Sequence, residues 1–230
     1  MNRFFFRELL ESNPKLLEEM IVFNRGAQRP TPAPEGLSEP LAAAVRRHPD
    51  LMRALARRSP ALARGRGPAA PAPCWDFTDE SRRLALMSAA DLSRLGRLMS
   101  AAVWAEDWAK VLARGAVLEI RAAMGEDVYE YGLARGRWQA GAMRASLRAL
   151  SGGGSLAERS IGLSRILLEE IRAGWPEALR ARTAELFAAT NLPAPTVLPE
   201  ISEADRKALW RFTRKIILRE LDPECRRAFS

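Results

Sequence analysis

The chain has 230 residues, of which 47% are hydrophobic and 28% are charged, and its formal net charge at pH 7 is +8. This composition excludes an intrinsically disordered protein and is sufficient for one large domain or two small ones. No stretch approaches the roughly 18 consecutive apolar residues of a membrane-spanning helix, and the apolar run at residues 4–6 is too short for a secretion signal.

The first predicted elements are two short helices within residues 2–24, where apolar residues recur near helical spacing. Asn13-Pro14 interrupts this stretch. Asn is a good N-cap and Pro is tolerated at the first helical position, so the second helix should begin at this dipeptide.

Proline-rich segments then divide the chain. Residues 26–40 predict a loop, a basic helical stretch follows at 41–62, and Pro and Gly at 65–73 predict a flexible linker. We therefore expect two regions: residues 1–73 with N-terminal helices and a basic linker, and residues 74–230 as the main helical domain.

The main domain is rich in good helix formers and has no alternating strand pattern. Two S-x-x-D sequences, at Ser88 and Ser202, have the form of a capping box and predict helix starts, whereas Gly125 and Gly174 predict ends. We expect an all-α, irregular multi-helix bundle. Its predicted helices are 88–113, 116–124, 126–134, 139–150, 156–173, 176–191 and 202–221.

Residues suited to catalysis are sparse. The single histidine, His48, precedes Pro49 in a basic stretch, and a lone exposed histidine is far more often a surface residue than a general base. Cys74 and Cys225 lack metal-ligand spacing and suit a reducing compartment, so we expect a cytoplasmic protein without a disulfide. There is no phosphate-binding loop and no nucleophile elbow. We expect no enzymatic activity, metal or cofactor.

Adjacent acidic residues occur four times, and their geometry disfavours acid/base catalysis. Neighbours on a helix point about 100° apart, so these residues are predicted to be solvated helix positions. The pairs are Glu18-Glu19, Glu106-Asp107, Glu126-Asp127 and Glu169-Glu170.

An arginine-rich segment, residues 46–66, contains Asp50 as its single acid. It could grip phosphates, and a helical nucleic-acid-binding regulator is the alternative function that it supports. However, it lacks interleaved aromatic residues for base stacking and contains no helix-turn-helix, so a solvated surface is favoured. A docking surface for an acidic protein is the third interpretation. The arginines considered for partner binding are Arg46, Arg47, Arg53, Arg57 and Arg58.

Six tryptophans provide further interface candidates, because Trp is enriched in binding hot spots. Trp75 and Trp138 lie next to predicted loops and are the better candidates for partner binding. Trp104, Trp108 and Trp210 lie within predicted helices and are expected in the core.

The end of the chain carries a recognisable pattern. Trp210-x-Phe212 leads into a basic and apolar helix over residues 214–221, and Pro223-x-Cys225-x-x-x-Phe229 follows. This resembles the end of the K subunit of type III secretion systems (the YscK/SctK family). Those proteins also finish with an amphipathic helix, a proline, and a small or aromatic residue shortly before a terminal Leu-Phe-like pair.

The centre is similar to the same family. Leu92-x-x-Leu95-Gly96 enters a helix, and Met124-Gly125 leads to an aromatic-rich stretch, Tyr129-x-Tyr131-Gly132. The resemblance covers residues 84–134 and 209–229. Its motifs are patterns of residue type, and residues 26–73 have no counterpart in the family.

The resemblance implies a role in protein transport. K subunits are non-enzymatic cytoplasmic adaptors of the sorting platform beneath the injectisome. They link the cytoplasmic domain of the inner-membrane ring to the pod protein of the Q type. The partners implied here are therefore these secretion-apparatus proteins, with contact to the membrane only through them. Neither a nucleic acid nor a cofactor is implied.

Overall fold

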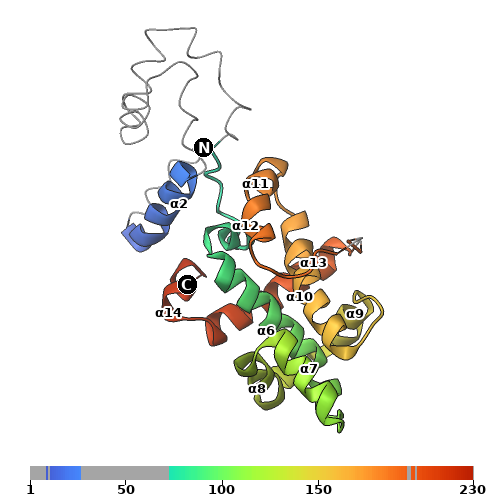
Figure 1. Cartoon of the computed structure of the whole chain (residues 1–230). Helices are drawn as coiled ribbons and strands as arrows, with labels where there is room; N and C mark the ends of the chain where they lie inside the picture. The colour runs from blue at the N-terminus through green and yellow to red at the C-terminus, as the bar shows by residue number, and fades with distance from the viewer. Residues whose placement is uncertain (1–8, 10, 27–72, 196–197, 200, 230) are drawn as a thin grey trace, which may run out of the picture. The chain divides into compact units, whose positions relative to one another are not determined.

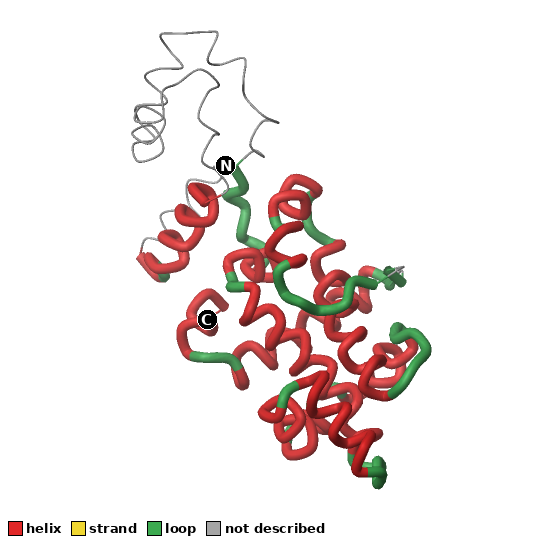
Figure 2. Tube along the Cα trace, viewed as in Figure 1, coloured by secondary structure: helices red, strands yellow, loops and turns green. Residues whose placement is uncertain are grey.

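The computed structural model describes residues 9, 11–26, 73–195, 198–199 and 201–229. These residues form helices joined by loops and no strand, which confirms the all-α prediction (Figure 2). The chain divides into two compact units. One comprises Met1–Leu17 and Trp75–Ser230, and the other comprises Glu18–Cys74.

In the larger unit, the start of α2 (Pro14–Gly26) is fixed by Asn13. The Asn13 Oδ1 accepts a hydrogen bond from the Leu16 amide at 3.1 Å, so the predicted helix start is confirmed. The Asn13 Nδ2 donates to the Arg227 carbonyl at 2.8 Å. The same residue thus caps a helix and ties it to the end of the chain.

The smaller unit contains one well-defined tertiary contact among its described residues. The Asn24 side chain donates to the Cys74 carbonyl at 2.8 Å and accepts from the Cys74 amide at 2.9 Å. Asn24 is 8% exposed, and its Nδ2 also bonds the Met20 carbonyl. The predicted loop, basic helix and linker between residues 27 and 72 lie outside the described residues.

The core of the larger unit is the contact between α6 (Ala89–Trp108) and α10 (Leu156–Ala173), and Figure 1 shows α6 running through the middle of this unit. Serines line the contact. The Ser100 Oγ donates to the Ser160 carbonyl at 2.6 Å, and the Trp108 Nε1 donates to the Ser160 Oγ at 3.1 Å. These bonds satisfy polar groups that would be costly to bury alone.

A glycine allows this close helix contact. A Cβ added at Gly96 would lie 2.8 Å from the Ser164 carbonyl oxygen and 3.0 Å from the Leu168 Cδ1. The Ser88 Oγ caps α6 by accepting from the Asp91 amide at 3.1 Å, as the capping-box pattern predicts. The equivalent bond at α13 joins Ser202 to the Asp205 amide.

The remaining helices surround this pair. One short 3-10 helix precedes α6, two lie between α8 and α9, and a further one ends the described chain. The elements are η1 (Glu80–Leu86), α7 (Arg114–Met124), α8 (Glu126–Ala134), η2 (Gly136–Trp138), η3 (Gly141–Met143), α9 (Arg144–Ala149), α11 (Glu177–Arg182), α12 (Ala184–Ala188), α13 (Glu203–Glu220), α14 (Pro223–Arg226) and η4 (Arg227–Phe229).

Three predicted helix extents were wrong. The helix predicted over 88–113 ends at Trp108, because the buried face ends there: Trp108 is 1% exposed and Leu112 is 95% exposed. Of the helix predicted over 139–150, only residues 144–149, which form α9, are α-helical. The helix over 176–191 is divided at Thr183 into two short helices. The Thr183 amide donates to the Leu179 carbonyl at 3.0 Å and its buried hydroxyl bonds the same carbonyl at 2.9 Å, a sharing that bends helices.

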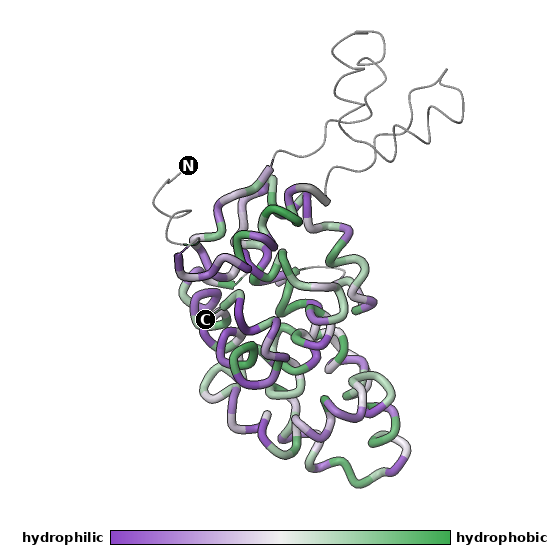
Figure 3. Tube along the Cα trace, turned by 90° about the vertical axis from the view of Figure 1, so that its left-hand side faces the viewer, coloured by the Kyte–Doolittle hydropathy of each residue, from purple (hydrophilic) through white to green (hydrophobic). Residues whose placement is uncertain are grey.

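Hydrophobic and hydrophilic residues intermix along the helices, as Figure 3 shows. The longer helices α6, α10 and α13 each combine buried and exposed positions, as expected for helices that pack on a core with one side. Within the described part of the chain, no helix combines the length and the apolar character needed to cross a bilayer.

Candidate partner-binding surface

The two tryptophans predicted to bind partners differ in their exposure to solvent. Trp138 is 70% exposed, whereas Trp75 is half-buried. The five arginines of the basic segment, Arg46 to Arg58, lie outside the described residues. Of the residues predicted to bind partners, Trp138 is therefore the one whose surroundings are described below.

The tryptophans expected in the core follow the prediction in two cases. Trp104 and Trp108 are buried. Trp210 is half-buried, and its ring lies 6.1 Å from that of Phe229. Trp175, which lies beside a predicted helix end, is also buried and packs edge-on against Phe187.

Trp138 ends η2, a tight turn that lies close to α6. Gly136 is buried there, and a Cβ at this position would lie 3.1 Å from the Tyr131 ring and 3.4 Å from the Ala102 Cα. The Gln139 amide closes the turn by donating to the Gly136 carbonyl at 2.8 Å. A Cβ at position 136 would therefore be in tight contact with the Tyr131 ring, which would have to give by a few tenths of an ångström.

Arg144 holds this turn from its far side. Its guanidinium donates to the Arg137 carbonyl and pairs with the Glu106 carboxylate on α6. Arg148, one turn further along α9, pairs with Asp107. The backbone beside Trp138 is thereby fixed to the end of α6.

The guanidinium of Arg137 lies over the exposed indole of Trp138. The Arg137 guanidinium lies 4.6 Å from the centre of the Trp138 ring, which is a cation–π contact. Among the described residues, no carboxylate lies within ion-pair distance of Arg137, whereas neighbouring Arg135 pairs with Glu220 at 2.9 Å.

Beneath this surface lies a polar cluster that sequence reasoning missed. The Glu220 side chain is 7% exposed, and its carboxylate forms an ion pair with Arg135 and accepts a hydrogen bond from the Gln139 Nε2 at 3.2 Å. The Tyr131 hydroxyl is buried beside it without a hydrogen-bond partner. Burial, together with the Glu220 charge, raises the pKa of Tyr131, so its hydroxyl stays neutral. We call residues 135–139 with Glu220 the Trp138 surface.

A second apolar region lies at the start of α7. Leu112 is 95% exposed in the loop before this helix, and Leu118 is 52% exposed on its outer side. A Cβ at Gly115 would meet no atom within 4 Å, so the space beside these leucines is open. We call Leu112, Gly115 and Leu118 the α7 surface.

One prediction about acidic pairs was wrong. Glu170 is not solvated: its side chain is 1% exposed, and neither carboxylate oxygen has a hydrogen-bond partner. Burial raises its pKa, and the Arg206 Nη2 at 3.7 Å opposes this effect only in part. The pattern of adjacent acids could not show which of the two faces the core.

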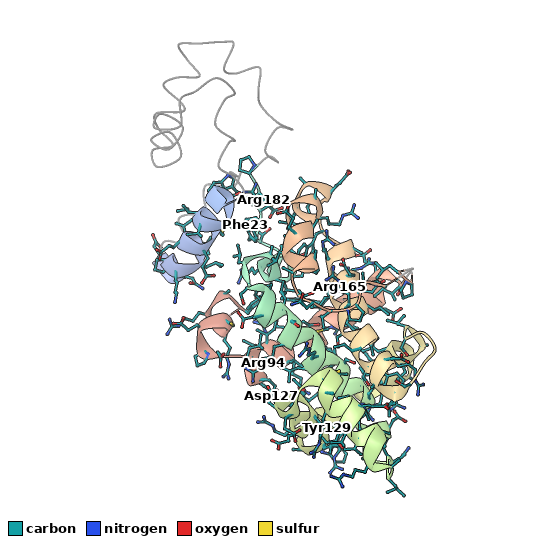
Figure 4. All side chains as sticks on the ribbon, in the orientation of Figure 1. Phe23, Arg94, Asp127, Tyr129, Arg165 and Arg182 are labelled. Carbon is teal, nitrogen blue, oxygen red and sulfur yellow. The ribbon has the colours of Figure 1, made fainter. Side chains whose placement is uncertain are left out.

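Arg165, also on α10, is a second buried charge that the sequence did not single out (Figure 4). Its guanidinium pairs with Glu169 at 2.7 Å and donates to the Thr190 Oγ1 at 2.8 Å and to the Phe187 carbonyl. This cation caps α12 and holds it against α10, which is a structural role.

Comparisons of this chain with protein families, with curated proteins and with solved structures give no match. In the described part of the chain, no three His, Cys, Asp or Glu side chains gather as metal ligands. What the described geometry offers is a fixed, exposed tryptophan with a cation on its face, and an apolar helix start.

Proposed function

We propose that this protein is a non-enzymatic cytoplasmic adaptor of a type III secretion sorting platform, similar to the K subunits. In this proposal it links the cytoplasmic domain of the inner-membrane ring to the pod protein of the Q type. The observation that carries the proposal is the 70% exposure of Trp138 on a turn that is fixed to the core.

An exposed, fixed tryptophan is well suited to binding. Trp provides a large contact area, and interface hot spots are enriched in it. The Trp138 backbone is held by Gly136 and Arg144, so little conformational freedom remains to be lost when a partner covers the ring.

An adaptor needs contacts for two partners, and the α7 surface supplies the second. Leu112 and Leu118 each expose an apolar side chain that a partner can cover, and they come from a different element than Trp138. Covering both side chains would remove apolar surface from water, which favours association. We assign one partner to each surface.

The test measures binding of the purified chain to the pod protein and to the inner-ring cytoplasmic domain, each by titration. Trp138→Ala is expected to weaken binding to one partner by about 30-fold, the effect of losing a hot spot of about 2 kcal/mol. The double variant Leu112→Ser, Leu118→Ser should weaken binding to the other. Lys207→Ala, at an exposed position on α13, is the control and should bind both normally.

A wild-type chain that binds neither protein would overturn the proposal. The alternative, nucleic-acid binding through residues 46–66, makes a different prediction. It requires affinity for duplex DNA that falls steeply as salt is raised. Strong DNA binding without binding to either secretion protein would favour that alternative.

A further inference from the structure

We infer that the partner segment covering Trp138 is acidic: a short peptide stretch that places a carboxylate on Arg137 and an apolar side chain on the indole. This inference rests on the proposed function, because it names the chemistry of one adaptor contact. The charges around the Trp138 surface support it.

Around Trp138, one arginine has no ion-pair partner among the described residues. Residues 135–157 contain four arginines and no Asp or Glu. Three of these cations are paired with acids from other helices. The pairs are Arg135 with Glu220, Arg144 with Glu106, and Arg148 with Asp107.

Arg137 is the fourth cation, and its position leaves it able to bind an anion. The Arg137 guanidinium carbon lies 4.6 Å from the centre of the Trp138 ring, and this cation–π contact depends on the charge and not on the N–H donors. The N–H groups can therefore donate to a carboxylate while the cation stays over the indole. A carboxylate on Arg137 would therefore strengthen the patch without displacing the indole.

The surrounding carboxylates favour a peptide over a nucleic acid. The side chains of Glu106 and Asp107 are 45% and 30% exposed beside the arginines that hold the turn. A phosphate backbone carries a charge at every nucleotide and would meet these acids as it crossed the surface. A peptide with one or two acids can place its charge on Arg137 alone.

The experiment observes Trp138 directly in the full-length chain. The protein contains six tryptophans, so a ¹⁵N-labelled sample gives six indole N–H signals, and loss of one signal in Trp138→Phe identifies the relevant one. The probe is a short peptide in which Asp and Glu flank a leucine. A peptide with Asn and Gln in place of these acids is its matched control, and a short single-stranded DNA is the third ligand.

The acidic peptide should shift the Trp138 signal and leave that of buried Trp175 in place. Arg137→Ala should weaken this peptide affinity about tenfold, the effect of one charge-assisted pair, and Arg137→Lys should weaken it less. Arg180→Ala removes the same charge from an exposed position on α11 and should leave the affinity unchanged.

Three results would overturn the inference: an equal shift with the amide peptide, a stronger shift with the DNA, or full peptide affinity in Arg137→Ala. These results are separable from a failure of the adaptor role. A chain that binds the acidic peptide at Trp138 but neither secretion protein contradicts only the proposed function. A chain that binds a secretion protein through Trp138 but ignores the acidic peptide contradicts only this inference.

Discussion

At the scale of single residues, the larger unit buries polar groups that it does not fully satisfy. Glu170 and Tyr131 are both almost fully buried, and neither the carboxylate oxygens nor the hydroxyl has a hydrogen-bond partner. Such groups lose their hydration without an equivalent replacement, which costs about 1–3 kcal/mol each and more for a charge. Both positions should therefore tolerate, and benefit from, less polar substitutions.

Glu170→Gln should stabilise the protein increasingly as pH rises. The folded-state pKa of Glu170 lies above the ordinary value of 4.5, so the folded chain holds its proton more tightly than the unfolded chain. The contribution of Glu170 to the free energy of unfolding is therefore most favourable below pH 4.5. It decreases as pH rises from 4.5 to the raised folded-state pKa. Denaturant unfolding of both proteins across this range should show the variant gaining about 1–2 kcal/mol on the wild type.

Glu169→Gln is the informative control, because Glu169 is the adjacent acid but is paired with Arg165 and Arg172. It should destabilise the protein at neutral pH. A stability difference between Glu170→Gln and wild type that does not change with pH would contradict the assignment of a raised pKa.

Tyr131→Phe removes a hydroxyl that is buried without a partner next to Glu220. The variant should raise the free energy of unfolding by about 1 kcal/mol, because it removes an unsatisfied polar group and leaves the ring in place. Tyr131→Ala should instead lower it by about 3–5 kcal/mol through cavity formation. Denaturant unfolding checks both, and a clear loss of stability in Tyr131→Phe would show that the hydroxyl is satisfied.

At the scale of helices, capping residues made the boundaries predictable, and tertiary packing decided the rest. Ser88 and Ser202 accept the hydrogen bonds that their sequence pattern predicts. The break at Thr183 depends on whether a buried hydroxyl turns back to the chain, and the end of α6 depends on where its burial stops. Local sequence does not encode either condition.

Gly96→Ala should test the close contact of α6 with α10. Alanine is the better helix former by about 1 kcal/mol, yet its Cβ would lie 2.8 Å from the Ser164 carbonyl oxygen. Overpacking of this kind costs about 1–3 kcal/mol, so we expect a net loss of stability in thermal and denaturant unfolding.

Gly162→Ala, inside α10, is the matched substitution. A Cβ there meets no atom within 4 Å, so only the helix propensity changes and the variant should gain up to about 1 kcal/mol. Equal effects at the two glycines would show that the helices do not approach as closely as described.

At the scale of the whole molecule, the end of the chain is part of the core of the larger unit. Phe229 is fully buried beside Trp210, and the carbonyls of Ala228 and Phe229 accept hydrogen bonds from Arg83 and Arg214. The sequence pattern singled out Phe229 through a family resemblance; the structure gives it a packing role.

Phe229→Ala should destabilise the protein by about 3–5 kcal/mol, because it leaves a cavity beside Trp210. Phe229→Leu refills most of that space and should cost much less. The midpoints of denaturant unfolding at constant m-value measure both. A Phe229→Ala protein as stable as the wild type would mean that this ring is not part of the core.

The candidate site was only partly accessible from sequence. A tryptophan beside a predicted loop could be proposed as exposed, and Trp138 is. The same reasoning selected Trp75, which is half-buried, because adjacency to a loop does not specify which way a ring turns. The ion pairs of the other three arginines join segments far apart in the chain. No local sequence pattern could therefore predict that Arg137 alone of the four would have no carboxylate partner.

The two hydrogen bonds between Asn24 and Cys74 decide which side chains can occupy position 24. Asn24 offers the Cys74 backbone one donor and one acceptor, and it does so at 8% exposure. A carboxylate of the same shape offers acceptors only, so Asn24→Asp would place an oxygen against the Cys74 carbonyl oxygen. The position therefore requires a carboxamide, although its size and burial alone would also suit an aspartate.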